Sequence, residues 1–190
     1  MALSINRKIL EEEFQPEELT TFSTAVVAGL QHEPSTRFLC DIGIPTRPNP
    51  WFDFVDGSPE QVKTLSECYN DIHSRWSNLP EGSERWLLLG LIPYDDIALD
   101  GITGAIYCLP GDQSDVYLLN QGLVSFCHFL FLLERERPYY DFESERETLD
   151  PEGAFQRLSA QMRKIDPIAM AVSHSNWYRI LDYIAYPESR

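Results

Sequence analysis

The sequence predicts an α+β fold in which an antiparallel β-meander of about four to six strands packs against several α-helices. Four short apolar segments lie between residues 86 and 119, and two of them, GAIYCL and VYLL, are rich in β-branched and aromatic residues, which is typical of strands. Tight turns containing Gly, Pro and Asp separate them, which favours antiparallel neighbours. A long apolar segment follows at once and has the spacing of a core helix. We therefore expect one face of the sheet to pack on helices.

The segment that precedes these strands is expected to form helices and loops. A first helix is predicted over residues 16–29, because acidic residues follow its starting proline and a glycine stands at its end. A second helix has Ser35 as its candidate N-cap, and Gly43 is predicted to stop it ahead of Pro45.

Residues 45–57 are predicted to form a loop, or a loop with one short strand. The next helix is expected to start with Ser58 as its cap and Pro59 at its first helical position. This helix carries an apolar stripe at helical spacing, which consists of Val62, Leu65, Tyr69, Ile72 and Trp76.

The meander is predicted from four segments, which cover residues 86–92 (WLLLGLI), 96–99 (DIAL), 104–109 (GAIYCL) and 116–119 (VYLL). The turn DGITG joins the second segment to the third, and PGDQSD joins the third to the fourth. Connections this short favour strands that pair with their neighbours in the chain.

The apolar run over residues 123–133 raises the question of a membrane anchor. A helix that crosses a bilayer needs about 20 apolar residues, and Glu134 ends this run well before that length. The run is therefore predicted to be a buried core helix, with Asn120 as its candidate N-cap. No membrane partner is expected.

Two further helices are predicted near the end of the sequence. One starts behind Asp150 and keeps Phe155, Leu158 and Met162 at helical spacing. The last is expected to begin at the Asp166-Pro167 pair, and its apolar positions are Trp177, Ile180, Leu181 and Ile184. A chain of 190 residues with one continuous pattern is expected to form a single domain over residues 1–190.

The formal net charge of the chain is −15 at pH 7. Proteins that hold nucleic acid need clustered Lys and Arg, so a nucleic-acid partner is not expected. An acidic chain fits a basic protein partner, and high solubility alone is the simpler explanation of the same charge.

The four cysteines form no CxxC pair, and zinc sites need ligands that converge at short spacing. We expect no metal or other cofactor, and free buried thiols in a reducing cytoplasm at Cys40, Cys68, Cys108 and Cys127. The acidic run 11–13 precedes any long apolar stretch, so no secretory signal is expected.

No sequence motif assembles a catalytic site. Cys127 and His128 are neighbours, but adjacent residues of a helix point about 100° apart. Residues 173–175 (SHS) lack the GxSxG context of a nucleophile, and no phosphate-binding glycine motif is present. Asp95 and Asp96 are interpreted as a turn ahead of a strand. We expect no enzyme, and a hydrolase or transferase that uses Cys40, Cys68 or His174 stays an alternative.

Two acidic segments rich in aromatic residues are candidates for partner binding. Residues 134–152 hold eight acids and three arginines, and residues 49–57 (NPWFDFVDG) alternate aromatic side chains with aspartates. A solvated linker is the simpler explanation of the first segment, and core packing explains the second equally well. As partner-binding residues we predict Trp51, Asp53, Asp95, Asp96, Asp100, Asp112, Asp115, Tyr139, Tyr140, Asp141 and Glu143.

Several structural motifs follow one another in a characteristic order from about residue 34 to the helix that contains Trp177. The residues that carry this order are Phe38, Leu39, Gly43, Pro45, Gly90, Thr103, Gly104, Asn120, Leu123 and Phe126. In this order the chain resembles the SUKH superfamily, and its fourth immunity subfamily in particular. Gln121 and Gly122 depart from the small polar residues that the family tends to place there.

The resemblance implies the SUKH (Smi/Knr-like) fold and the function of an immunity protein in a bacterial polymorphic toxin system. Such a protein binds a cognate toxin domain, often a nuclease or deaminase, inside the producing cell. The expected partner is a basic toxin domain, and the protein is expected to be a cytoplasmic monomer or weak oligomer. A regulatory or scaffold protein of the same fold is the alternative.

Overall fold

The computed structural model describes residues 5–46, 50–54, 62–143 and 149–186 of the chain. Its main sheet has five antiparallel strands in the order of the sequence, so the predicted meander is confirmed. The strands are β3 (Asp53–Phe54), β4 (Leu87–Ile92), β5 (Asp95–Leu99), β6 (Ile106–Leu109) and β7 (Tyr117–Asn120). A separate two-stranded sheet pairs β1 (Leu19–Thr20) with β2 (Ile44–Pro45).

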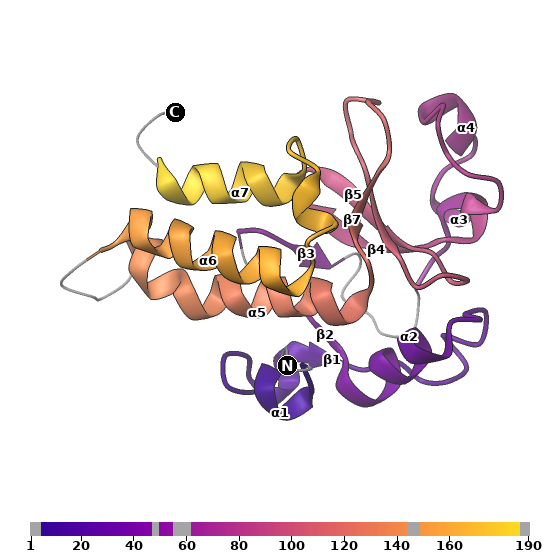
Figure 1. The fold of residues 1–190 in the computed structure, drawn as a ribbon. Helices are drawn as coiled ribbons and strands as arrows, with labels where there is room; N and C mark the ends of the chain where they lie inside the picture. Colours follow the sequence, from indigo (N-terminus) through magenta and orange to yellow (C-terminus); the bar gives the residue numbers. More distant parts are fainter. Residues whose placement is uncertain (1–4, 47–49, 55–61, 144–148, 187–190) are drawn as a thin grey trace.

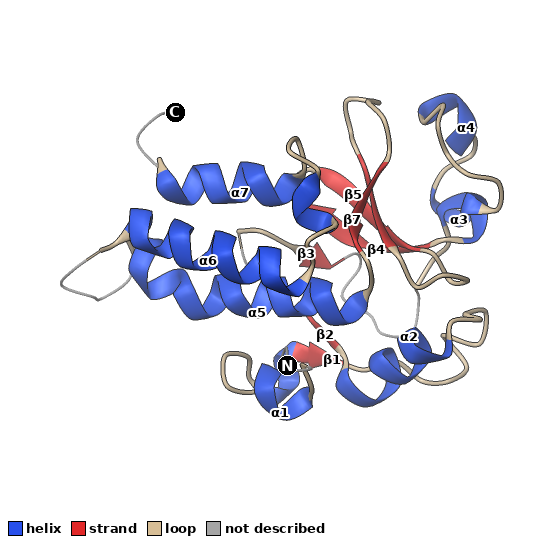
Figure 2. Cartoon of the chain, in the orientation of Figure 1, coloured by secondary structure: helices blue, strands red, loops and turns tan. Residues whose placement is uncertain are grey.

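Helices cover both faces of the main sheet, whereas the sequence led us to expect helices on one face (Figure 2). The long helices α5 (Leu123–Tyr140), α6 (Pro151–Ile165) and α7 (Asn176–Ala185) lie on one side, and the short helices α3 (Leu65–Cys68) and α4 (Ile72–Arg75) lie on the other. The alternation of strand side chains explains the arrangement, because Ile97 and Leu99 of β5 join the larger apolar cluster and Ala98 joins the smaller.

The helix α5 begins after Gly122, so the prediction that Asn120 is its N-cap is wrong. Asn120 is the last residue of β7, where it is fully buried, and its side-chain oxygen accepts a hydrogen bond from Trp177 Nε1 at 3.1 Å. The helix also continues to Tyr140, beyond the end of the apolar run. The predicted linker over residues 134–152 is therefore helical at its start.

Within the described residues, no helix combines the length and the hydropathy needed to cross a bilayer. The helix α5 is buried between the sheet and α6, which accounts for its apolar character on nearly all sides (Figure 1).

The helix α6 follows Asp150 as predicted, and the Asp150 carboxylate accepts a hydrogen bond from the Gly153 backbone N–H at 3.0 Å. The last helix starts at Asn176 rather than at the Asp166-Pro167 pair. Asp166 ends α6 instead, and a 3₁₀ turn (Ala169–Ala171) separates the two helices. The carboxylate of Asp166 accepts a hydrogen bond from the Ala169 backbone N–H, which closes this turn.

The predicted helix over residues 16–29 is wrong. The chain forms a 3₁₀ turn (Pro16–Glu18), the strand β1 and then a series of turns. Pairing of Leu19 with Pro45 and of Thr20 with Ile44 overrides the local helical pattern. A short helix, α1 (Arg7–Leu10), lies ahead of this segment.

The second predicted helix is present but starts earlier. It consists of α2 (Glu33–Arg37) and a π-helical turn (Phe38–Ile42), so Ser35 lies inside it and is not its N-cap. The Ser35 hydroxyl is paired with Nδ1 of His32 at 2.8 Å. Gly43 ends the segment as predicted, with φ of +87°, and a Cβ there would lie 2.6 Å from the Thr20 carbonyl oxygen.

The predicted helix from Ser58 to Trp76 is interrupted. Ser58 and Pro59 lie outside the described residues. Beyond them the chain forms α3 and α4 with a break between them, because the Asp71 carboxylate accepts a hydrogen bond from the Ser74 backbone N–H and caps a new helix. A 3₁₀ turn (Ser83–Arg85) then leads into β4. The short strand expected within residues 45–57 is present as β3.

Candidate partner-binding surface

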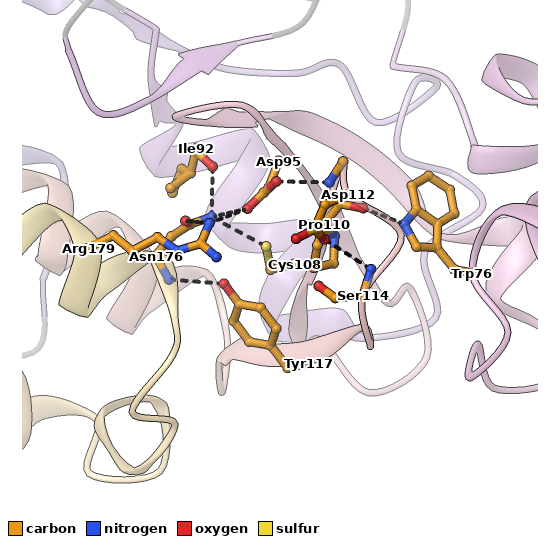
Figure 3. A network of polar contacts seen from close by, with 11 residues as sticks. Trp76, Ile92, Asp95, Cys108, Pro110, Asp112, Ser114, Tyr117, Asn176 and Arg179 are labelled. Atoms are coloured by element: carbon orange, nitrogen blue, oxygen red, sulfur yellow. Dashed lines mark hydrogen bonds and ion pairs between the residues drawn. The ribbon is translucent and has the colours of Figure 1, made fainter.

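A buried polar network fixes the N-terminus of α7 on the sheet (Figure 3). The centre of this network is Asp95, which is largely buried. Asp95 is the first residue of β5, so the prediction that it lies in a turn ahead of the strand is wrong. One carboxylate oxygen of Asp95 accepts a hydrogen bond from the Gly111 backbone N–H at 2.9 Å. The other accepts bonds from Asn176 Nδ2 at 3.0 Å and Arg179 Nη1 at 3.4 Å. Asp95 therefore joins the turn that follows β6 to the last helix.

Asn176 supplies most of the contacts on the helix side. Its side-chain Nδ2 also donates to the Ile92 carbonyl oxygen at 2.7 Å, and its backbone N–H donates to the Tyr117 hydroxyl at 3.0 Å. The Cys108 sulfur lies 3.5 Å from the same Nδ2. Burial raises the pKa of Cys108 to about 12, so this thiol is protonated at neutral pH. These contacts set the position of α7 and of the side chains on its outer face.

Two adjoining cavities open beside α7, and Trp51 and Tyr183 line both of them. The first cavity, of about 260 Å³, is completed by Pro93, Tyr94, Asp95, Asn176, Arg179 and Ile180. The second, of about 330 Å³, lies where α5 ends and is completed by Pro50, Arg137, Tyr140, Asp141, Phe142, Glu143 and Ile184. Aromatic side chains are frequent anchors at protein interfaces, so we take these cavities as the candidate partner-binding surface.

The shared wall of the two cavities is held rigidly. The indole Nε1 of Trp51 donates to the Tyr140 hydroxyl at 3.0 Å, and that hydroxyl donates to the Leu133 carbonyl oxygen at 2.9 Å. The rings of Trp51 and Tyr183 meet edge to face with centroids 5.4 Å apart. Burial raises the pKa of Tyr140, so its hydroxyl keeps the proton that it donates.

The charges around the second cavity are predominantly negative. Arg137 Nε lies 2.8 Å from a carboxylate oxygen of Asp141, and Arg137 Nη1 lies 3.5 Å from Glu134. The hydrogen bond from Arg137 lowers the pKa of Asp141, and a further bond from the Glu143 backbone N–H acts in the same direction. Among the described residues that line this cavity, Asp141 and Glu143 carry negative charge and Arg137 carries positive charge, so the lining has one carboxylate more than it has guanidinium groups.

The structure brings four of the predicted partner-binding residues together at this surface: Trp51, Tyr140, Asp141 and Glu143 line the second cavity. Asp95 lines the first. Tyr139 points elsewhere, with the guanidinium carbon of Arg157 4.8 Å from its ring centroid. Asp53 is an exposed residue of β3.

The other predicted aspartates lie in the hairpins of the sheet. Asp96 is buried as the second residue of β5, outside any turn, and accepts a hydrogen bond from the Tyr69 hydroxyl at 2.6 Å. Asp100 accepts bonds from the Ile102 backbone N–H and the Thr103 hydroxyl, which closes the turn after β5. Asp112 accepts a bond from the Ser114 backbone N–H in the turn after β6 (Figure 3). Asp115 is exposed in the same turn. The carboxylates of Asp100 and Asp112 order these two turns.

Sequence reasoning missed Tyr94, Tyr183, Asn176 and Arg179. Tyr94 is 90% exposed in the turn between β4 and β5, and Tyr183 is 44% exposed on α7. The sequence contained one signal for Tyr183, which lies outside the apolar stripe of the last helix. An aromatic residue on the polar face of a helix does not pack in the core, so it indicates a binding surface. No comparable signal marked Asn176.

The candidate catalytic residues are not assembled into a site. Cys127 is fully buried and its burial raises its pKa, while burial lowers the pKa of the neighbouring His128. His174 is exposed, and its ring contacts Tyr117 edge to face. Cys40 and Cys68 are half-buried. In the part of the chain that the structure describes, no three or more His, Cys, Asp and Glu side chains converge as a metal site would require.

The sequence model of the SUKH-4 immunity proteins matches residues 5–183 of the chain. The chain belongs to the SUKH-4 immunity protein family. The predicted resemblance to the fourth SUKH subfamily is therefore confirmed. The family match includes every described residue that lines the two cavities except Ile184. Comparisons with curated proteins and with solved structures gave no match.

Proposed function

We propose that the protein binds a cognate bacterial toxin domain and neutralises it inside the producing cell, without catalysing a reaction. Membership of the SUKH-4 immunity protein family is the observation that carries this proposal. Burial raises the pKa of the Cys127 thiol beside His128, and this supports a non-catalytic role for that pair.

The charge of the chain supports a basic partner. A net charge of −15 attracts a positively charged domain and raises the rate of encounter. Toxins that act on nucleic acids need basic clefts for the phosphate backbone. The proposed partner is accordingly a nuclease or deaminase domain, and the proposed mode of inhibition is obstruction of its basic cleft by an acidic surface.

Coexpression with the toxin domain encoded beside the gene tests the function. The expected result is that cells survive expression of the toxin only when this protein is present, and that the two chains copurify at low salt. An unrelated protein of similar size and net charge serves as the control and is expected to give no protection. Survival without copurification, or no protection at all, contradicts the proposal.

A further inference from the structure

We propose that the second cavity, between the C-terminal end of α5 and α7, binds a lysine or arginine side chain of the toxin domain. The inference rests on the proposed function and adds the site and the chemistry of recognition. The size, the walls and the charge of the cavity support it.

The size of the cavity suits one side chain. Its volume is about 330 Å³, at the lower end of the roughly 300–1,000 Å³ found for small-molecule sites. The cavity is open to solvent where Phe142 and Tyr183 are 59% and 44% exposed. A long, unbranched side chain from a partner can therefore enter it while the partner backbone stays outside.

The walls of the cavity favour a cation. Four aromatic side chains line it, namely Trp51, Tyr140, Phe142 and Tyr183. The faces of such rings carry partial negative charge and attract ammonium and guanidinium groups within about 6 Å of the ring centroid. Trp51 and Tyr140 are buried and joined by a hydrogen bond, so this part of the wall needs no rearrangement on binding.

The charge at the rim of the cavity also favours a cationic occupant. Asp141 and Glu143 stand beside the rings, and Arg137 is already paired with Asp141 and with Glu134. The excess of carboxylates over guanidinium groups in the described lining disfavours an anionic occupant, and a purely apolar occupant would leave this negative charge without a counter-charge. A basic side chain places its apolar stem against the rings and its charged head near the carboxylates.

Replacement of the rings by leucine separates cation recognition from apolar contact. The affinity of Phe142→Leu and Tyr183→Leu for the toxin domain is measured by calorimetry beside that of the unchanged protein. Leucine keeps apolar surface but removes the ring, so we expect each Kd to rise by about threefold to thirtyfold. Tyr183→Phe keeps the ring and is expected to stay within about twofold. Ile102→Ala, at a residue 57% exposed in the turn between β5 and β6, is the surface control and is expected to bind unchanged.

The outcomes separate the two proposals. If the unchanged protein binds and both leucine variants bind within about twofold of it, the cation-binding cavity is wrong and the immunity function stands. If the unchanged protein does not bind, the proposed function fails and this inference fails with it. A double-mutant cycle completes the test: each lysine and arginine of the toxin domain is replaced by alanine, and the affinity of each toxin variant is measured with the wild-type protein and with Tyr183→Leu. For one toxin residue, the loss of binding free energy in the double variant is expected to differ from the sum of the two single losses. Additive losses at every toxin position would overturn the cavity assignment.

Discussion

Asp166 is the most densely hydrogen-bonded carboxylate among the described residues. It is fully buried and accepts bonds from Asn120 Nδ2, from the backbone N–H and Nε2 of Gln121, from the Ser125 hydroxyl and from the Ala169 backbone N–H. One side chain thus joins the end of β7, the start of α5 and the turn after α6. Its removal leaves several buried donors without an acceptor.

Substitution of Asp166 by alanine is expected to lower the free energy of unfolding by about 3–5 kcal/mol, because hydrogen bonds to a charged group contribute about 1.5–3 kcal/mol each and are not additive. Equilibrium unfolding in urea measures the change. Asp112→Ala, which removes an aspartate with a backbone hydrogen bond in an exposed turn, is the control and is expected to cost much less. Equal losses in the two variants would contradict the structural role of Asp166.

The same carboxylate predicts a pH dependence. Burial would raise the pKa of Asp166, but the hydrogen bonds from Gln121, Ala169 and Ser125 outweigh burial and hold the pKa below its ordinary value of 3.8. A carboxylate with a lowered folded-state pKa stabilises the fold above its unfolded pKa, and this contribution is lost as the pH falls through the folded-state value.

The stability advantage of the unchanged protein over Asp166→Asn is therefore expected to be constant above about pH 5 and to shrink as the pH falls below 3.8. Urea unfolding of both proteins across this range measures the advantage, and comparison with the asparagine variant removes the effect of the other acids. An advantage that stays constant down to about pH 2 would show that Asp166 is not the group that titrates.

At the level of elements, the docking of α7 depends on Asn176. Substitution by alanine removes the donor to the Ile92 carbonyl oxygen and to buried Asp95, so we expect the free energy of unfolding to fall by about 2–4 kcal/mol. Arg179→Ala is the matched control on the same helix, because its contact with Asp95 is 3.4 Å long and its side chain is largely exposed. A cost below about 0.5 kcal/mol is expected there, and similar costs in both variants would contradict the assignment.

The contact between the turn after β5 and the start of α2 depends on Gly104. Its φ is +78°, and a Cβ there would lie 2.1 Å from His32 Nδ1. Gly104→Ala is expected to cost about 2–4 kcal/mol of stability, of which about 1 kcal/mol comes from the positive φ and the rest from the clash. When His32 is also replaced by alanine, the clash is removed, and only the cost of about 1 kcal/mol from the positive φ should remain. A double-mutant cycle by thermal unfolding measures this coupling, and additive costs would mean that the two residues do not meet.

The sequence predicted elements where local pattern and tertiary structure agree. The strands of the meander and the helix α6 have regular patterns and a turn or cap at their ends, and the structure places them within a few residues of the prediction. The segment over residues 16–29 and the last helix were placed wrongly, because a distant strand partner and a buried carboxylate set their boundaries. Neither interaction leaves a local pattern.

The candidate site was predictable only in part, for the same reason. The acidic and aromatic composition singled out Trp51, Tyr140 and Asp141, which line one cavity. Their proximity depends on a hydrogen bond between residues 89 positions apart, and on α5 continuing past its apolar run to Tyr140. Aspartates in the hairpins, such as Asp100, were predicted on the same grounds as Asp141, but their carboxylates close turns and do not line the cavity.

For the whole molecule, two apolar clusters on opposite faces of one sheet hold the elements in place, and the aromatic cavities lie at one end of the larger cluster. This arrangement leaves binding residues on well-packed elements, which lowers the cost of ordering them on association. We propose that the protein acts by binding a basic toxin domain through its negative charge.

The association rate constant with the toxin domain encoded beside the gene, measured by stopped flow at about 50 mM and about 500 mM salt, tests this claim most directly. Because opposite charges accelerate encounter and salt screens them, the rate constant is expected to fall by about tenfold or more at the higher salt. An association rate constant that does not change with salt, or the absence of association at low salt, would contradict the claim.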